Sequence, residues 1–160
     1  MIKKTAVKKA TAKKSVTKQA PEKKTNKVKT SEPVMQILKT SKCKTVSEKS
    51  ELTYNIAQDE KGNAVIRIAA NTGGGFWSRE YVSIGAIVDC IRAVPEDQSV
   101  TSIHLFKLFT GKSQNTPGFL LAVLLKEGLL VPTGKKRQYS VSEVGIDAFL
   151  AKVDELKSVK

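Results

Sequence analysis

The chain is poor in the residues that build metal centres and disulfide frameworks. Its 160 residues include two cysteines and one histidine. Cys43 and Cys90 are far apart and form no motif, so we expect no disulfide framework, and we predict a buried, reduced thiol at Cys90. His104 has no Cys, Asp or Glu at metal-ligand spacing. We therefore predict a structural histidine, no metal site and no cofactor.

Patterns typical of catalytic centres are also missing. No nucleophile lies at an arguable spacing from a base, and no paired carboxylates lie where their pKa values would be perturbed, so we predict that the protein is not an enzyme. No apolar run is long enough to span a membrane, and the basic N-terminus lacks the apolar segment of a secretory signal. We expect a soluble, cytoplasmic protein with no membrane partner.

Arginine and aromatic residues are absent from the first 49 residues, where the positive charge is concentrated. This segment holds 15 lysines and 3 glutamates, a net charge of +12, whereas residues 50–160 hold 13 cations and 12 carboxylates. Such a segment cannot bury enough apolar area to offset the entropy of ordering it. We therefore predict a disordered lysine-rich tail over residues 1–49 and a folded domain over residues 50–160.

The lysines of this tail recur as pairs every five residues, with one single lysine where a pair would fall. A lysine ammonium is a compact charge that neutralises phosphates without distinguishing bases. Without aromatic residues, the tail has no platform that stacks on unpaired bases. We predict that it contacts the phosphate backbone of duplex DNA in a sequence-tolerant way, through Lys3, Lys4, Lys8, Lys9, Lys13, Lys14, Lys18, Lys23 and Lys24.

A junction over residues 31–50 follows, whose apolar residues 34–38 either form one helical turn or dock on the domain. Beyond it, alternating apolar residues predict a β-hairpin that closes through the turn at Gly62 and Asn63. The glycines at 73–75 predict a loop, and residues 76–82 a third strand. We therefore expect a small antiparallel β-hairpin region over residues 50–82.

The rest of the chain alternates helical and strand patterns. Apolar spacing predicts a helix over 84–94 capped by Ser83, a short helix over 102–109 and a helix from 116 to 127 with Pro117 in its first turn. A hairpin over 129–141 and a final helix over 142–156 follow. The fold class is therefore α+β, with a winged-helix-like region over residues 83–157 behind the hairpin and the tail.

Two segments carry a resemblance to known families. Residues 124–130 resemble the end of a recognition helix entering its wing, and residues 139–145 resemble the strand that returns into a capped helix. Over about residues 83–156 the chain thus resembles a winged-helix DNA-binding domain, and residues 1–30 resemble the arms of histone H1-like proteins. The resemblance implies a DNA-binding protein that is nucleoid-associated, histone-like or transcription-modulating.

In winged-helix proteins, the second helix of the motif enters the major groove and the wing touches the backbone or the minor groove. Here the helix core over 119–125 is apolar around its circumference, so we predict weak or absent sequence specificity. Either the N-terminal hairpin packs over this helix, or the helix forms a homodimer or partner interface. The resemblance assigns DNA contacts to Lys112, Ser113, Gln114, Asn115, Thr116, Lys126, Lys135, Lys136 and Arg137.

The glycine-rich stretch before Phe76 and Trp77 lacks the Lys-Ser/Thr ending of a phosphate-binding P-loop. We interpret it as a loop, and predict that both aromatic side chains belong to the core, with an exposed stacking pair as the alternative. Arg79 is a further candidate for a phosphate contact. Two other functions stay open for the whole chain: an adaptor that docks a protein partner through its folded domain, and an RNA- or ribosome-associated protein.

Overall fold

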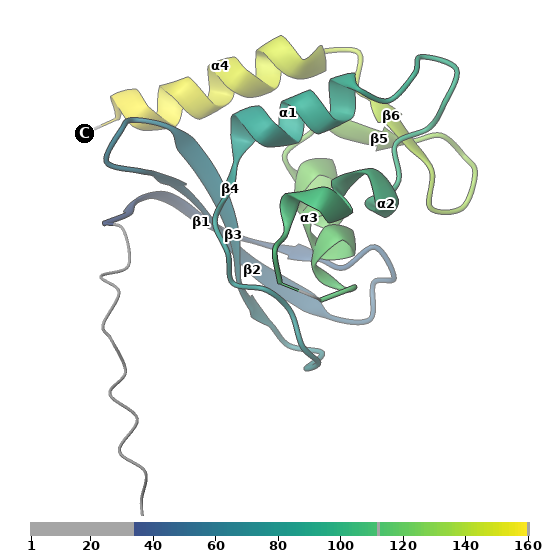
Figure 1. The fold of residues 1–160 in the computed structure, drawn as a ribbon, viewed down its shortest axis with the longest axis horizontal. Helices are drawn as coiled ribbons and strands as arrows, with labels where there is room; N and C mark the ends of the chain where they lie inside the picture. The colour runs from purple at the N-terminus through teal and green to yellow at the C-terminus, as the bar shows by residue number, and fades with distance from the viewer. Residues whose placement is uncertain (1–33, 112, 160) are drawn as a thin grey trace, which may run out of the picture. The chain divides into compact units, whose positions relative to one another are not determined.

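The computed structural model describes residues 34–111 and 113–159 (Figure 1). The lysine-rich stretch before residue 34 lies outside the described residues. Residues 34–111 and 113–159 form an α+β unit, in which an antiparallel sheet precedes a group of helices and a small hairpin.

The sheet has four strands in the order β1-β2-β3-β4, and each neighbouring pair is antiparallel. Its central hairpin is the one that the alternating pattern predicts, and Gly62 closes it with a φ of +85°. Asp59 fixes the same turn by accepting hydrogen bonds from the backbone N–H groups of Lys61 and Asn63. The strands are β1 Gln36–Lys44, β2 Glu51–Gln58, β3 Ala64–Asn71 and β4 Val82–Ser83.

The first strand corrects the predicted extent of the tail. Residues 36–44 do not form part of a tail or a helical turn, because they pair along their length with β2 as the edge of the sheet. The alternative that the apolar residues 34–38 dock on the domain is therefore confirmed for residues 36–38, which belong to β1. The predicted boundary at residue 49 is wrong, since the fold already includes β1 and the turn at 45–50.

The predicted third strand over 76–82 is also wrong, because only Val82 and Ser83 pair with β3. The segment before them is held by side chains of a later helix instead. The backbone N–H of Ser78 donates to Thr116 Oγ1 at 2.8 Å. This N–H is therefore not available to a strand ladder.

The helices follow the sheet in the predicted order. Val100 forms an isolated antiparallel bridge with Tyr139, so the short extended segment before the second helix meets the final hairpin. Gly128 ends the third helix with a φ of +82°. The elements are α1 Ile84–Arg92, α2 Ser102–Leu105, the 3-10 turn η1 Phe106–Leu108, α3 Thr116–Lys126, β5 Leu130–Pro132, β6 Tyr139–Val141 and α4 Gly145–Ser158.

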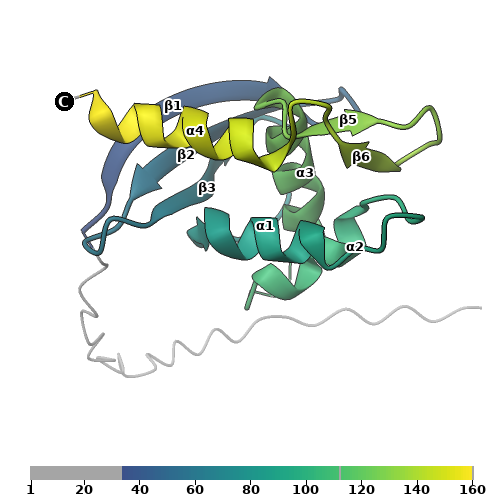
Figure 2. The ribbon, with the colours of Figure 1, turned by 90° about the horizontal axis from the view of Figure 1, so that it is seen from above.

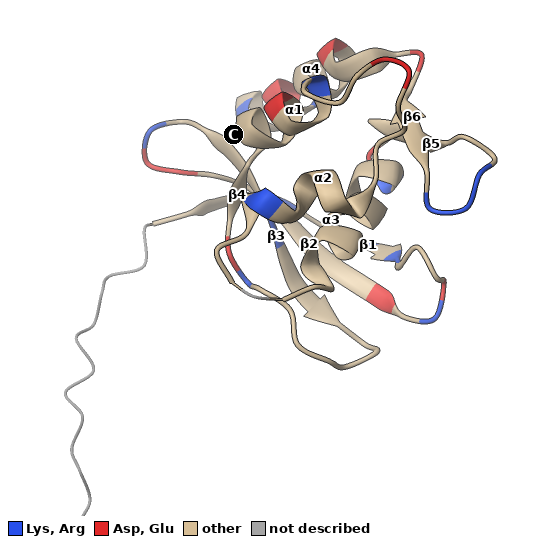
Figure 3. Cartoon of the chain, turned by 45° about the vertical axis from the view of Figure 1, so that its right-hand side comes forward, with Lys and Arg blue, Asp and Glu red and all other residues tan. Residues whose placement is uncertain are grey.

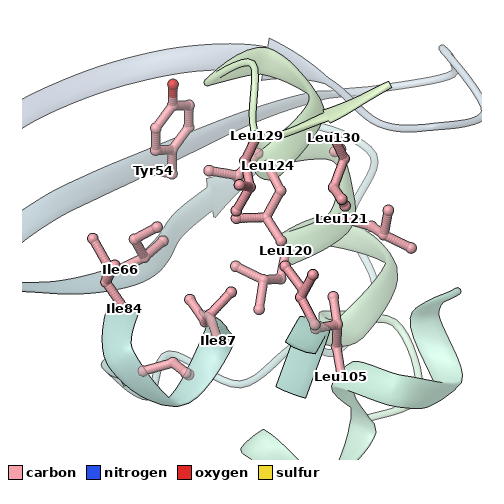
Figure 4. Close-up of a cluster of buried hydrophobic side chains, with 14 of the residues drawn as sticks. Tyr54, Ile66, Ile84, Ile87, Leu105, Leu120, Leu121, Leu124, Leu129 and Leu130 are labelled. Carbon is pink, nitrogen blue, oxygen red and sulfur yellow. The ribbon is translucent and has the colours of Figure 1, made fainter. Parts of the chain in front are cut away.

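Helix α3 occupies the centre of the core (Figure 4). It packs on β1 and β3 of the sheet on one side and on α2 and β5 on others. Leu120, Leu121 and Leu124 are buried against residues such as Ile87 and Leu105. Of the two explanations for an apolar helix, the one in which the N-terminal hairpin packs over it is confirmed for its strand β3, and β1, which was not part of that prediction, packs there as well.

The last helix, α4, runs across one end of the unit above the sheet (Figure 2). It buries Phe149 and Val153, and the exposed Val144 precedes the helix as its N-cap. Of the helices described here, none combines the length and the apolar character that crossing a membrane requires.

Candidate nucleic-acid interface

A groove of about 1110 Å³ runs over the outer side of α3. One arm is the turn that follows β1, and the other is the wing, which we define as the β5–β6 loop at residues 133–138. Both arms project to the same side of the molecule (Figure 3). The polar and charged side chains around it include Lys44, Glu48, Gln114, Asn115, Lys126, Lys135, Lys136 and Arg137.

Backbone and hydroxyl hydrogen bonds fix both arms. In the turn after β1, the buried Thr45 donates its N–H to Ser50 O at 2.9 Å and accepts from Glu48 N at 2.8 Å. In the wing, Thr133 N and Thr133 Oγ1 both donate to Gln138 O. Because their backbones are held in this way, the two arms keep their charged side chains at defined edges of the groove.

Each arm carries a residue in the left-handed backbone region. Glu48 has a φ of 58° and Arg137 a φ of 60°, and within residues 34–111 and 113–159 no other non-glycine residue has a positive φ. This conformation costs an L-residue roughly 1–2 kcal/mol. Glycine would avoid that cost at both positions, so the side chains retained there are candidates for a role other than stability.

The charge around the groove differs from that of its surroundings. Five cations line it, Lys44, Lys126, Lys135, Lys136 and Arg137, against the single carboxylate of Glu48. The other described residues hold ten cations and twelve carboxylates. The described part of the chain therefore concentrates its excess positive charge at this groove, and an anion that approaches it meets an attractive local field.

The floor of the groove is apolar between these charged arms. Phe119 and Leu125 are half-buried on α3, and Cys43 and Tyr139 are buried at the sides. Burial raises the pKa of the Cys43 thiol to about 11 and also raises the pKa of Tyr139, so both groups stay neutral at physiological pH. A ligand thus meets cations at the edges and an uncharged surface beneath.

The structure brings most of the predicted domain contacts together. Gln114, Asn115, Lys126 and the three wing cations all line the groove. Ser113 and Thr116 are removed from the predicted DNA-contacting residues, because both are buried and their hydroxyls bind Phe76 O and Ser78 N. The remaining predicted contacts, at Lys112 and on the tail lysines, lie outside the described residues.

The glycine loop meets the beginning of α3 beside this groove. Phe76 O accepts from Ser113 Oγ at 2.9 Å and from Asn115 Nδ2 at 3.1 Å, so the backbone is anchored. Its ring is nevertheless 72% exposed, and the prediction of a core position for Phe76 is wrong. Trp77, by contrast, packs against the core, and the guanidinium of the exposed Arg79 lies 5.5 Å from its ring centre.

A carboxylate secures the far side of this loop. Glu80 accepts hydrogen bonds from Ser78 Oγ at 2.6 Å, from Thr110 Oγ1 and from Gly111 N. The hydrogen bonds from Ser78 and Thr110 hold the pKa of Glu80 below its usual value. Residues 76–80 are therefore joined to the segment that leads into α3 at both ends.

A buried carboxylate, Glu127, lies at the end of α3, and its side chain is 2% exposed. Lys39 Nζ lies 2.6 Å from Glu127 Oε1, Lys152 Nζ lies 2.9 Å from Oε2, and the Tyr54 hydroxyl donates to Oε1. Burial alone would raise the pKa of Glu127, but the bonds from Lys39, Tyr54 and Lys152 outweigh it and lower the pKa. Through these bonds, Glu127 links the end of α3 to β1, β2 and α4.

The histidine has a local structural contact. His104 Nδ1 accepts from the backbone N–H of Thr101 at 3.0 Å, at the first turn of α2. Across residues 34–111 and 113–159, no group of three or more His, Cys, Asp and Glu side chains is placed to hold a metal ion.

Three contributors to the groove were missed by sequence reasoning. Lys44 and Glu48 fall in the segment predicted as tail, where the lysine content conceals a strand and its turn. Phe119 belongs to a uniformly apolar run whose exposed side depends on what packs against it. Residues 36–44 show no regular alternation of apolar and polar residues, so the sequence carries no clear signal of the strand that positions Lys44 and Glu48.

The chain was compared with protein-family models, with curated proteins and with solved structures, and none of them matches it.

Proposed function

We propose that the protein is a non-enzymatic, largely sequence-tolerant DNA-binding protein of the nucleoid-associated, histone-like or transcription-modulating kind. The observation that carries the proposal is the groove, where five cations face one carboxylate while the rest of the described surface has no excess of cations. Phosphates neutralised by lysine and arginine release condensed counterions, and this release drives binding.

The order of elements supports a winged-helix arrangement as part of this proposal. Helix α1, the bridge residue Val100, the α2 segment, α3 and the β5–β6 hairpin follow one another, and Val100 pairs with Tyr139 of the hairpin. Three cations occupy the hairpin tip, where a wing in such proteins touches the DNA backbone.

Sequence tolerance follows from the surroundings of α3. Reading a base edge requires polar side chains aimed into a DNA groove. Helix α3 is buried along most of its length, and its exposed polar groups are confined to Gln114 and Asn115 at its start and Lys126 at its end. We therefore propose that the wing and Lys126 bind phosphates and that α3 does not lie in the major groove.

The lysine-rich N-terminal stretch adds affinity in this proposal. Its paired lysines, from Lys3 to Lys24, supply a dense array of charges that carries no information about sequence. Such an array accelerates association and steepens the dependence of affinity on salt. Nucleoid association is the cellular consequence that we propose.

The decisive test is the salt dependence of duplex binding by the full chain. We expect Lys135→Gln/Lys136→Gln to weaken binding and to reduce the slope of log affinity against log salt by roughly 2, about one for each phosphate that is no longer neutralised. The matched control is Lys61→Gln/Arg92→Gln, which removes two exposed charges outside the groove. An equal loss of affinity in both variants would contradict a role for the wing.

A second variant tests the tail within the full chain. Replacing the nine lysines from Lys3 to Lys24 that form the repeated array with glutamine keeps the chain length and removes the charge. We expect weaker duplex binding and a shallower salt dependence. Unchanged affinity would contradict the proposed contribution of the tail, and a preference for structured RNA in competition would favour an RNA-associated function instead.

An adaptor that docks a protein is the second candidate, and the apolar floor of the groove favours it. This function predicts a stoichiometric protein partner that binds less tightly to a Phe119→Leu variant with an intact fold. It also predicts that the unmodified chain retains no DNA.

A further inference from the structure

The floor of the groove is apolar, and the outside of a closed duplex has no apolar surface of this kind. In a duplex, the base faces are hidden in the stack, and the outside presents phosphates and polar base edges. An unpaired strand exposes its base faces, and these stack on aromatic side chains while cations bind the phosphates. The groove combines such features, because cations line its arms and Phe119 lies half-buried between them.

Phe119 is held in place by the first turns of α3. Its N–H donates to the backbone oxygen of Asn115 at 3.0 Å, so the two residues lie on the same side of the helix. Asn115 also lines the groove. The ring of Phe119 and the side chain of Asn115 therefore belong to one surface that leads from the floor toward the start of α3.

Phe76 lies where this surface meets the glycine loop. The Asn115 amide that lines the groove donates to Phe76 O at 3.1 Å, and Ser113 fixes the same oxygen from the buried side. Burying a phenylalanine ring stabilises a fold by removing apolar surface from water. Phe76 does not contribute this stabilisation, because its side chain is exposed even though hydrogen bonds hold its backbone.

We propose that the groove and the adjoining glycine loop bind an unpaired stretch of DNA, with Phe119 stacked on a base in the groove, Phe76 stacked on a base beside it and the cations of the two arms on the flanking phosphates. The inference rests on the proposed DNA-binding function and names the form of DNA that the folded part prefers. Base faces are similar for all four bases, so such a site is tolerant of sequence. It also accounts for a central helix that lacks base-reading side chains.

The test compares two DNA molecules of equal length and charge, one a closed duplex and the other with a central run of mismatched thymines. The full chain is expected to bind the mismatched DNA more tightly. Phe76→Ala should lower affinity for the mismatched DNA by about 5- to 100-fold, the range expected when one base has no aromatic ring to stack on, and leave closed-duplex binding unchanged. The salt slope should not change, because no charge is removed.

The matched control is Phe106→Ala, the same substitution at a residue that is 47% exposed and lies on η1 rather than on the loop that Asn115 anchors. It should leave both affinities unchanged. Because Phe119 also packs against the core, Phe119→Leu is preferred to alanine there, and its melting curve checks that the fold is intact. A fluorescent base analogue in the mismatched run should change its emission on binding, and Phe76→Ala should abolish the change.

The outcomes separate this inference from the proposed function. Equal binding of closed and mismatched DNA by the unmodified chain would overturn the inference and leave duplex binding standing. Failure to bind either DNA would overturn both. A preference for mismatched DNA that neither Phe76→Ala nor Phe119→Leu reduces would overturn the assignment of the two rings as the stacking residues.

Discussion

The hydroxyl of Tyr54 donates a hydrogen bond to the buried carboxylate of Glu127, which also binds Lys39 and Lys152. Tyr54 comes from the middle of the sheet, and Glu127 from the end of the central helix. Burial and this bond raise the pKa of the Tyr54 hydroxyl, so it remains a donor at any physiological pH. The pair thus fixes the helix that carries the groove against the sheet behind it.

We expect Glu127→Ala to lower the free energy of unfolding by about 3 kcal/mol, because it leaves the buried Tyr54 hydroxyl without its acceptor and the ammonium groups of Lys39 and Lys152 without their counter-charge. Urea denaturation of the full chain measures the decrease. The control is Glu51→Ala, which breaks the exposed pair with Lys42 and should have a much smaller effect. Equal decreases would show that the cluster contributes no more than a surface pair.

The same carboxylate predicts the direction of acid sensitivity. The pKa of Glu127 is lowered in the folded state, so its contribution is fully present above the unfolded value of about 4.3 and is lost as the pH falls through the folded value. Stability of the unmodified chain should therefore decline below about pH 4.3. Glu127→Gln should be less stable at neutral pH and show a weaker decline, as measured by urea midpoints across the acid range.

Arg137 should show opposite effects on stability and binding. Arg137→Gly removes the left-handed strain at the wing and should leave stability unchanged or raise it by up to about 1 kcal/mol. It also removes a cation of the groove, so duplex binding should weaken and the salt slope fall by roughly 1. In Lys136→Gly, whose backbone is not left-handed, both stability and binding should decrease. A lower stability of Arg137→Gly would contradict this interpretation.

Gly73 tests the close approach of the glycine loop to the turn after β1. A Cβ atom at Gly73 would lie 2.7 Å from Ser50 Cβ, so Gly73→Ala must displace one of the two segments and should lower the melting temperature. The comparison is Gly85→Ala in α1, where a Cβ has room and alanine favours the helix by about 0.5–1 kcal/mol. A higher melting temperature for both variants would contradict the predicted clash.

The elements that the sequence predicts well are those fixed by local chemistry. The β2–β3 hairpin follows from alternation and the turn at Gly62, and α3 follows from Pro117 at its start and Gly128 at its end. The wing follows from cations between two short strands. In each case the residues that determine the conformation are neighbours in the chain.

The features that the sequence does not predict depend on distant partners. Strand β1 reads as tail because Lys42 and Lys44 contribute to the charge excess, whereas on an edge strand such lysines face solvent and deter pairing with other chains. The exposure of Phe76 depends on hydrogen bonds from residues more than thirty positions later. The sequence therefore does not predict the side of the groove that the turn after β1 forms, because this turn meets α3 only in the folded chain.

The cluster at Glu127 has a consequence for how the chain acquires its structure. Lys39 precedes Glu127 by 88 residues and Lys152 follows it by 25, so the first strand and the last helix share one acceptor. Contacts of such high sequence separation slow folding, because a long loop must close before they form. On the ribosome, the first strand emerges early but cannot complete its contacts until the final helix has been synthesised.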